Sequence, residues 1–155
     1  MRVAFRYLGL CLAAGAAGLL GCGRPLLERP RPTVETISKD IPGDRFKTIV
    51  TIAGGGDSRT DLRISVNVRA RLQKAGVTAM RQAGRWETEQ DALGMVCDQS
   101  GVDGMLVVQY NRLRLFDCTT KKLAYDVQSH PEGGTEGALK LADRLVEYLQ
   151  GRKKA

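Results

Sequence analysis

One apolar run, Gly104–Tyr110 (GMLVVQY), constrains the fold of this chain more than any other segment. Its branched and aromatic side chains, bounded by turn-forming residues, give the strongest strand signal in the sequence. Patterns typical of helices and of further strands lie on both sides of it. We therefore expect a sheet on which helices pack.

Two further strands and one ambiguous segment precede this run. Phe46–Ala53 (FKTIVTIA) predicts a buried strand, and Val77–Met80 predicts another. Between them, Leu62–Leu72 alternates apolar and polar residues, which favours a strand, but its apolar residues also form one stripe of a helix. We predict a helix, because Ser58 offers a cap at its start and Gly76 a stop signal after its end.

The second half of the chain predicts a helix, a hairpin and a last helix. Thr88 and Asp91 have capping-box spacing for a helix that ends before Gly101. After Tyr110, apolar residues alternate with arginines, and a turn then leads to Lys122–Gln128 (KLAYDVQ). The last helix carries an apolar stripe made by Ala138, Leu141, Ala142, Leu145, Val146 and Leu149.

The expected elements follow the order β-α-β-α-β-β-β-α, which predicts a single α/β (α+β) domain over residues 46–150. Two strand–helix–strand units imply right-handed parallel crossovers, and the hairpin adds antiparallel strands. The expected architecture is one mixed sheet with helices packed on it, followed by a short basic tail at 151–155.

The amino terminus has the pattern of an export signal. Arg2 and Arg6 precede an uncharged, mostly apolar run of 13 residues, Leu8–Leu20, which is followed by small residues. This run is shorter than the roughly 20 residues that span a bilayer core. The sequence Leu-Leu-Gly-Cys at 19–22 resembles the lipobox of bacterial lipoproteins.

The lipobox resemblance implies that a signal peptide at 1–21 is removed and that Cys22 is the lipidated first residue of the mature protein. Because Gly23 and not Asp follows it, the resemblance also implies the outer membrane, with the domain facing the periplasm. Cys11 fits less well, because a bulky residue, Leu10, precedes it. Leu20 departs from the family, which more often has a small residue there. An ordinary cleaved signal and a cytosolic apolar helix are the alternatives.

Residues 22–45 are expected to form a lipidated, flexible tether. Four prolines disfavour a helix there, and charged residues keep the segment in solvent. Large apolar side chains are too few to offset the entropy lost on ordering.

The mature chain stays basic, because removal of the signal takes two arginines and no acid from a formal net charge of +7. Nucleic acid is not an expected partner of an exported, membrane-tethered protein. Anionic lipid headgroups, a cell-wall polymer or an acidic protein face fit the charge better. A solvated basic surface explains it as well.

Three segments carry a resemblance to known envelope domains: Leu72–Val77, Gly101–Val108 and Leu113–Leu123. They are similar to a helix-to-strand turn, a central strand and a hairpin with an Asp-x-x-Thr turn in the amino-terminal domain of TolB, lipoprotein activators of penicillin-binding proteins and curli secretion lipoproteins. Cys118 and the missing turn glycine depart from that pattern. The resemblance implies a module for partner binding or assembly, not an enzyme.

A glycine loop and a histidine are residue types found at phosphate-binding or catalytic sites, but the residues that such sites also need are missing beside them. Gly54–Gly56 lies between a strand and a helix, where a loop can bind phosphate, but it matches neither nucleotide-binding pattern and Asp57 would repel an anion. His130 is the only histidine, and adjacent Ser129 does not make a catalytic pair with it. We therefore expect a plain glycine turn and no catalytic, cofactor or metal site.

Two cysteines and the single tryptophan leave alternatives open. Once Cys22 is lipidated, only Cys97 and Cys118 can pair in the mature chain, and such a disulfide would stabilise by roughly 3 kcal/mol. The other possibility is two buried thiols that act as small apolar side chains. Trp86 either anchors a partner from an exposed position or holds the second helix against the sheet.

These features predict a membrane-anchored envelope lipoprotein whose non-catalytic domain binds a protein or cell-wall partner in an assembly or accessory role. The alternative is an auxiliary lipoprotein of a lipid or solute export system, with a cleft that contacts the cargo. A concave pocket would favour cargo binding, and a flat patch with aromatic anchors would favour a protein partner.

Overall fold

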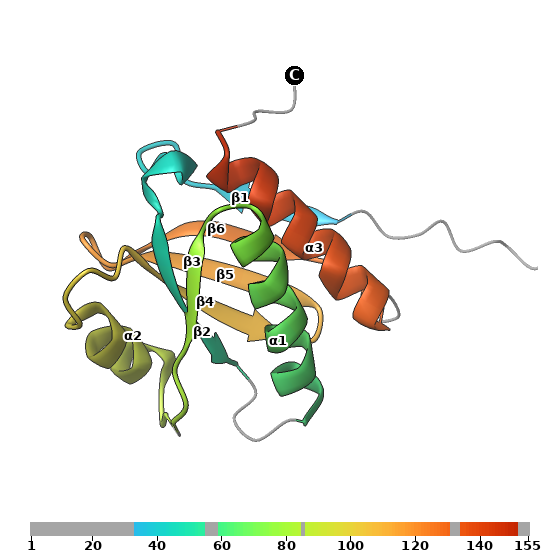
Figure 1. Ribbon diagram of the computed structural model, residues 1–155, viewed down its shortest axis with the longest axis horizontal. Coiled ribbons are helices and arrows are strands. Elements are labelled where there is room, and N and C mark those ends of the chain that lie inside the picture. Colours follow the sequence, from blue (N-terminus) through green and yellow to red (C-terminus); the bar gives the residue numbers. More distant parts are fainter. Residues whose placement is uncertain (1–32, 55–58, 85, 131–133, 152–155) are drawn as a thin grey trace, which may run out of the picture.

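The computed structural model describes residues 33–54, 59–84, 86–130 and 134–151. The strands form one six-stranded sheet in the order β1-β6-β5-β4-β2-β3 (Figure 1). In chain order the elements are β1 (Val34–Ile37), the 3-10 helix η1 (Gly43–Arg45), β2 (Thr48–Ala53), α1 (Arg59–Lys74), β3 (Thr78–Arg81), α2 (Glu89–Cys97), β4 (Gly104–Gln109), β5 (Arg112–Asp117), β6 (Lys122–Gln128) and α3 (Gly134–Leu149).

The sheet is mixed, as the sequence predicts. Strand β2 runs parallel to both of its neighbours, β3 and β4. The pairs β4–β5, β5–β6 and β6–β1 are antiparallel. Helices α1 and α3 cover one face of the sheet, and α2 covers part of the other face, over β2 and β4 (Figure 1). The predicted α/β class with helices packed on a mixed sheet is confirmed.

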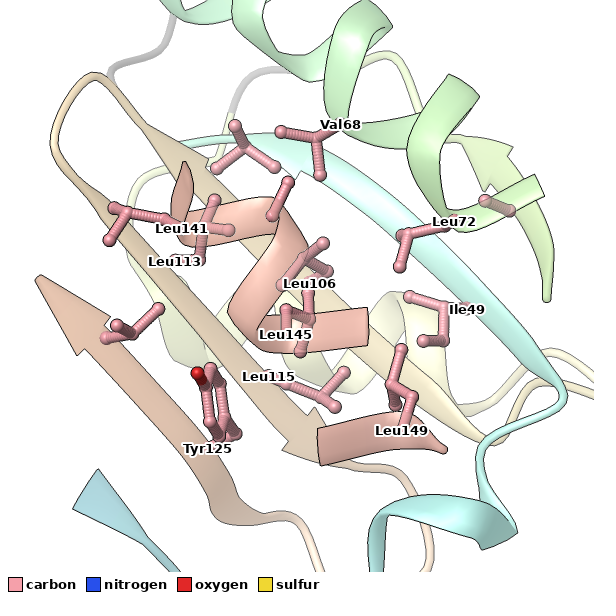
Figure 2. Packing of buried hydrophobic residues seen from close by; sticks show 14 of the residues in the cluster. Ile49, Val68, Leu72, Leu106, Leu113, Leu115, Tyr125, Leu141, Leu145 and Leu149 are labelled. Atoms are coloured by element: carbon pink, nitrogen blue, oxygen red, sulfur yellow. The ribbon is translucent and has the colours of Figure 1, made fainter. Parts of the chain in front are cut away.

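The main core lies between the sheet and the helices α1 and α3. Leu141, Leu145 and Leu149 stand four residues apart on α3 and are at most 6% exposed. Figure 2 shows them gathered with Val68 and Leu72 of α1 above the sheet. The strands contribute Ile49, Leu106, Leu113, Leu115 and Tyr125.

A smaller core lies on the opposite face, between α2 and the neighbouring strands β2 and β4. It contains Ala92, Leu93, Val96, Val50, Ile52, Met105 and Val107. A disulfide joins Cys97, the last residue of α2, to Cys118, just after β5, with the Cα atoms 4.9 Å apart. Of the two alternatives for these cysteines, the structure has the pair. The bond connects α2 to the antiparallel half of the sheet.

Local signals in the sequence are reproduced in detail. Residues 62–72 are helical, within α1. A capping box opens α2, because the Thr88 hydroxyl accepts from the Asp91 amide and the Asp91 carboxylate accepts from the Thr88 amide, each at 3.1 Å. In the hairpin turn, Asp117 accepts from the Thr120 amide at 2.8 Å. Lys121 takes a φ of 54°, the conformation that a turn glycine usually supplies.

The prediction of a flexible tether over 22–45 is wrong for residues 34–45, and the domain begins before residue 46. Strand β1 pairs with β6 along its whole length. Ile41 is 4% exposed, and its carbonyl accepts from the Tyr148 hydroxyl at 2.6 Å. Main-chain pairing at the sheet edge holds β1, and because all four of its side chains are exposed, no apolar pattern marked it.

Residues 22–32 of the predicted tether, Cys22 among them, and the signal peptide lie outside the described residues, as do residues 152–155 of the basic tail. In the part of the chain that the structure describes, no helix is both long enough and apolar enough to cross a membrane.

Candidate functional site

The order of the strands creates a switch point at one end of the sheet. The chain leaves β2 for α1 on one face of the sheet, whereas it leaves the neighbouring strand β3 for α2 on the opposite face. The two connections therefore diverge beyond the carboxyl ends of β2 and β3. In open α/β sheets, ligands bind in the crevice that such a divergence leaves.

A cleft of about 180 Å³ lies at this point. One wall comes from the end of β2, a second from the second turn of α1, and a third from the segment between β3 and α2. Its lining residues are Thr51, Ala53, Leu62, Ser65, Arg81, Gln82, Ala83, Gly84 and Trp86. We call it the switch-point cleft.

Hydrogen bonds hold the strand walls of this cleft. Thr51 is fully buried, and its hydroxyl donates to the carbonyl of Met80 at 3.0 Å. The backbone amide of Gln82 donates to the carbonyl of Thr51 at 3.1 Å, which continues the β2–β3 pairing past the last strand residue. The Gln82 side chain accepts from the amide of Gln99 at 3.0 Å. These bonds fix the β2 and β3 walls of the cleft.

Two polar side chains of the cleft have no partner among the described residues. Ser65 is only 4% exposed, and its hydroxyl makes no hydrogen bond to a described residue. Arg81 is exposed and forms no ion pair within the described part of the chain. The Ser65 hydroxyl is not among the fully buried side-chain atoms that lack a partner in the described part of the chain, so solvent in the cleft reaches it.

Trp86 forms the aromatic side of the cleft. Its indole lies so close to the backbone of Gly84 that a Cβ there would stand 2.6 Å from Cζ2 of the ring. The ring also packs against the small core under α2. Of the two alternatives for Trp86, the structural one holds, because the ring braces the segment before α2. The same ring also borders the cleft.

A second and larger cleft, of about 320 Å³, lies along α3 next to Thr33 and Ser129. Its charged groups already have partners. Asp143 accepts from Arg71 at 2.6 Å, Arg144 lies 3.5 Å from Glu35, and Lys140 lies 2.9 Å from Glu136. Because these charged groups are already paired with one another, they are less available to bind a ligand than the polar groups of the switch-point cleft.

The other residues that the sequence singled out are not brought together. Gly54 is needed for packing, because a Cβ there would stand 2.5 Å from the Gln109 side chain, whereas Gly55 and Gly56 lie outside the described residues. His130 follows β6, and the Ser129 hydroxyl donates to its backbone carbonyl at 3.4 Å and not to its ring. Within the described residues, no group of three or more histidine, cysteine or acidic side chains could hold a metal ion.

No family model matches this chain, and no curated protein matches it in sequence. Among solved structures, the PelC dodecamer from Paraburkholderia phytofirmans is similar, with a TM-score of 0.50 and 14% identity over 79% of this chain and 99% of that one. A variant of the same protein gives a TM-score of 0.50 and 12% identity over 78% and 99%. At these identities the likeness shows a shared fold alone.

A prolyl-tRNA synthetase from Cryptosporidium parvum is a weaker match, with a TM-score of 0.41 and 15% identity over 66% of this chain and 22% of that one. This likeness is too distant to carry an argument about function.

Proposed function

We propose that this chain is an exported, membrane-anchored lipoprotein that acts as a non-catalytic accessory component of an envelope export system, with a polysaccharide as cargo. The observation that carries the proposal is the fold shared with PelC, an accessory lipoprotein of polysaccharide export, over almost the whole of that protein. The export alternative raised by the sequence therefore takes precedence over docking to a cell-wall or other envelope partner.

Two independent features support the envelope location. The lipobox-like sequence at 19–22 makes Cys22 the proposed site of acylation, and Gly23 favours the outer membrane, with the domain in the periplasm. The disulfide between Cys97 and Cys118 fits an oxidising compartment, because cytosolic thiols are usually kept reduced.

Self-association is the second part of the proposal, and it is supported by the dodecameric state of the PelC structure. The sheet ends in two different edges, β1 and β3. Both carry exposed apolar side chains, with Val34 and Ile37 on β1 and Met80 on β3. Unpaired strand edges pair readily with another chain, and a head-to-tail contact between unlike edges can close into a ring.

The test is a deletion of the gene followed by complementation, with surface and periplasmic polysaccharide quantified separately. Complementation with the wild-type chain is expected to restore surface polysaccharide. Cys22→Ser is expected not to do so, and to move the protein from the membrane to the soluble fraction, because the substitution removes the sulfur that carries the proposed lipid anchor.

Cys11→Ser is the matched control, because it removes a cysteine from the same segment and leaves the sequence at 19–22 intact. It is expected to behave as wild type. Unchanged surface polysaccharide in the deletion strain would refute the export role. A single-copy mass for the purified lipoprotein in mild detergent would refute self-association.

A further inference from the structure

We propose that the switch-point cleft binds one acidic sugar unit, a hexuronate residue of a polysaccharide chain. The source of that sugar rests on the proposed function. The site itself follows from the chemistry of four lining side chains, Trp86, Ser65, Gln82 and Arg81, which reach the cleft from two different segments of the chain.

Trp86 supplies the apolar platform. One face of a pyranose ring presents mainly C–H groups, which pack against the flat π-surface of an indole. The close approach of the indole to Gly84, together with its packing on the core under α2, holds the ring in one place before a ligand arrives. A pre-positioned platform loses little conformational entropy on binding.

Ser65 and Gln82 supply hydrogen bonds for the hydroxyls of a sugar. Ser65 is nearly buried and lines the cleft, and its hydroxyl makes no hydrogen bond to a described residue. A ligand hydroxyl would replace solvent at this group. The Gln82 side chain already accepts from Gln99, which orients its amide at the cleft.

Arg81 selects an acidic sugar over a neutral one. Arg81 lines the cleft, and its guanidinium has no carboxylate partner within the described part of the chain. A guanidinium binds a carboxylate through two parallel hydrogen bonds, which a neutral hydroxymethyl group cannot reproduce. Asp61, the acidic residue of α1, is not among the lining residues, and Asp57, which follows β2 in the chain, lies outside the described residues.

The size of the cleft sets the length of chain that it holds. Its volume of about 180 Å³ is below the roughly 300–1,000 Å³ of pockets that enclose a drug-sized ligand. One sugar unit would enter, and its neighbours along the chain would stay in solvent. Such a site holds a passing polymer weakly, as an export component requires.

The experiment uses intrinsic fluorescence of the full-length lipoprotein in detergent, because Trp86 is the only tryptophan of the chain. A trimer of galacturonic acid is titrated against a trimer of galactose, which has the same ring geometry and no carboxylate. The acidic trimer is expected to change the fluorescence saturably. The neutral trimer is expected to bind at least about tenfold more weakly, because it cannot form the charge-assisted hydrogen bond to Arg81.

Arg81→Ala and Ser65→Ala are expected to weaken binding of the acidic trimer without lowering the melting temperature. Arg63→Ala is the matched control, because Arg63 is exposed on α1 outside the cleft and the substitution makes the same change in net charge. The proposal is overturned if neither trimer changes the fluorescence, if the two bind equally, or if Arg63→Ala weakens binding as much as Arg81→Ala.

The outcome of this binding experiment can be distinguished from the outcome of the export test. Saturable binding in a strain whose export does not need the chain would leave the site standing and remove the export role. Export that depends on the chain, with no response to either sugar, would leave the role standing and remove this site.

Discussion

Ile41→Ala tests whether the segment ahead of β2 belongs to the folded domain. Ile41 is 4% exposed and lies in the main core, between the end of β1 and η1. Truncating a buried isoleucine removes its transfer free energy and leaves a cavity, at a cost of about 2–5 kcal/mol. Tyr148, which lies beside it and is only partly buried, can move to fill some of that space. We therefore expect the lower part of the range, about 2–3 kcal/mol.

The same substitution at Ile37 is the matched control, because Ile37 lies in the same segment but is 50% exposed. It is expected to cost about 0.5 kcal/mol. Urea denaturation of the oxidised chain measures both, and a loss of 2–3 kcal/mol lowers the midpoint by about 1–2 M. Equal midpoints for the two variants would show that residues 34–45 contribute no core, and that a tether reaching to residue 45 describes them better.

Three further predictions concern the core, the disulfide and a tyrosine. Leu145→Ala should cost about 2–5 kcal/mol in urea denaturation, whereas Leu139→Ala, partly exposed on the same helix and outside the core, should cost clearly less. Reduction of the bond between Cys97 and Cys118 should lower the free energy of unfolding by roughly 3 kcal/mol, and thiol titration under denaturant should find no free thiol from this pair before reduction. Burial, and then the charge of Asp117, raise the pKa of Tyr148 to about 12 from 10.0. Because folding favours the neutral phenol, the contribution of Tyr148 to the free energy of unfolding should be complete below pH 10 and should be lost as the pH rises towards 12. Tyr148→Phe should remove this part of the pH dependence of unfolding.

Most of the fold could be predicted because its signals are local. The capping box of Thr88 and Asp91 and the leucine stripe of α3 are complete within one helix. The segment 62–72 shows how two local signals can conflict. Its alternation favours a strand, whereas the stripe of Ile64, Val68 and Leu72 favours a helix, and the helix is the observed structure. These three residues are the buried apolar residues of α1.

Strand β1 was not predicted from the sequence, and the reason is physical. An edge strand with all four side chains exposed needs no apolar alternation, because its partner strand supplies the hydrogen bonds. Two tertiary contacts that no local pattern encodes reinforce it: the Tyr125 hydroxyl donates to Glu35 at 2.5 Å, and Arg144 lies 3.5 Å from the same carboxylate. None of the four prolines that suggested a tether falls within β1, so they did not argue against a strand there.

The switch-point cleft could not be predicted as a site, because its walls come from segments separated along the chain. The available signal was a single tryptophan shortly after a strand, preceded by a glycine. Without the strand order, nothing indicated that Trp86 and Gly84 would lie beside the second turn of α1 and Ser65. The crevice exists only because β3 pairs with β2 while the next crossover passes to the other face of the sheet.

The strand order also separates the cleft from the point where the described chain begins. Thr33 leads into β1 at one edge of the sheet, and the cleft lies between β2 and β3 at the other. With neighbouring strands about 4.8 Å apart, four to five spacings amount to about 19–24 Å. Acylation of Cys22 should therefore not alter the cleft. Cys22→Ser protein is expected to give the same fluorescence titration with the acidic trimer as the lipidated protein. A change in affinity of more than about threefold, roughly 0.7 kcal/mol, would mean that the anchor and the cleft are coupled, either through the sheet or through neighbouring copies of the chain.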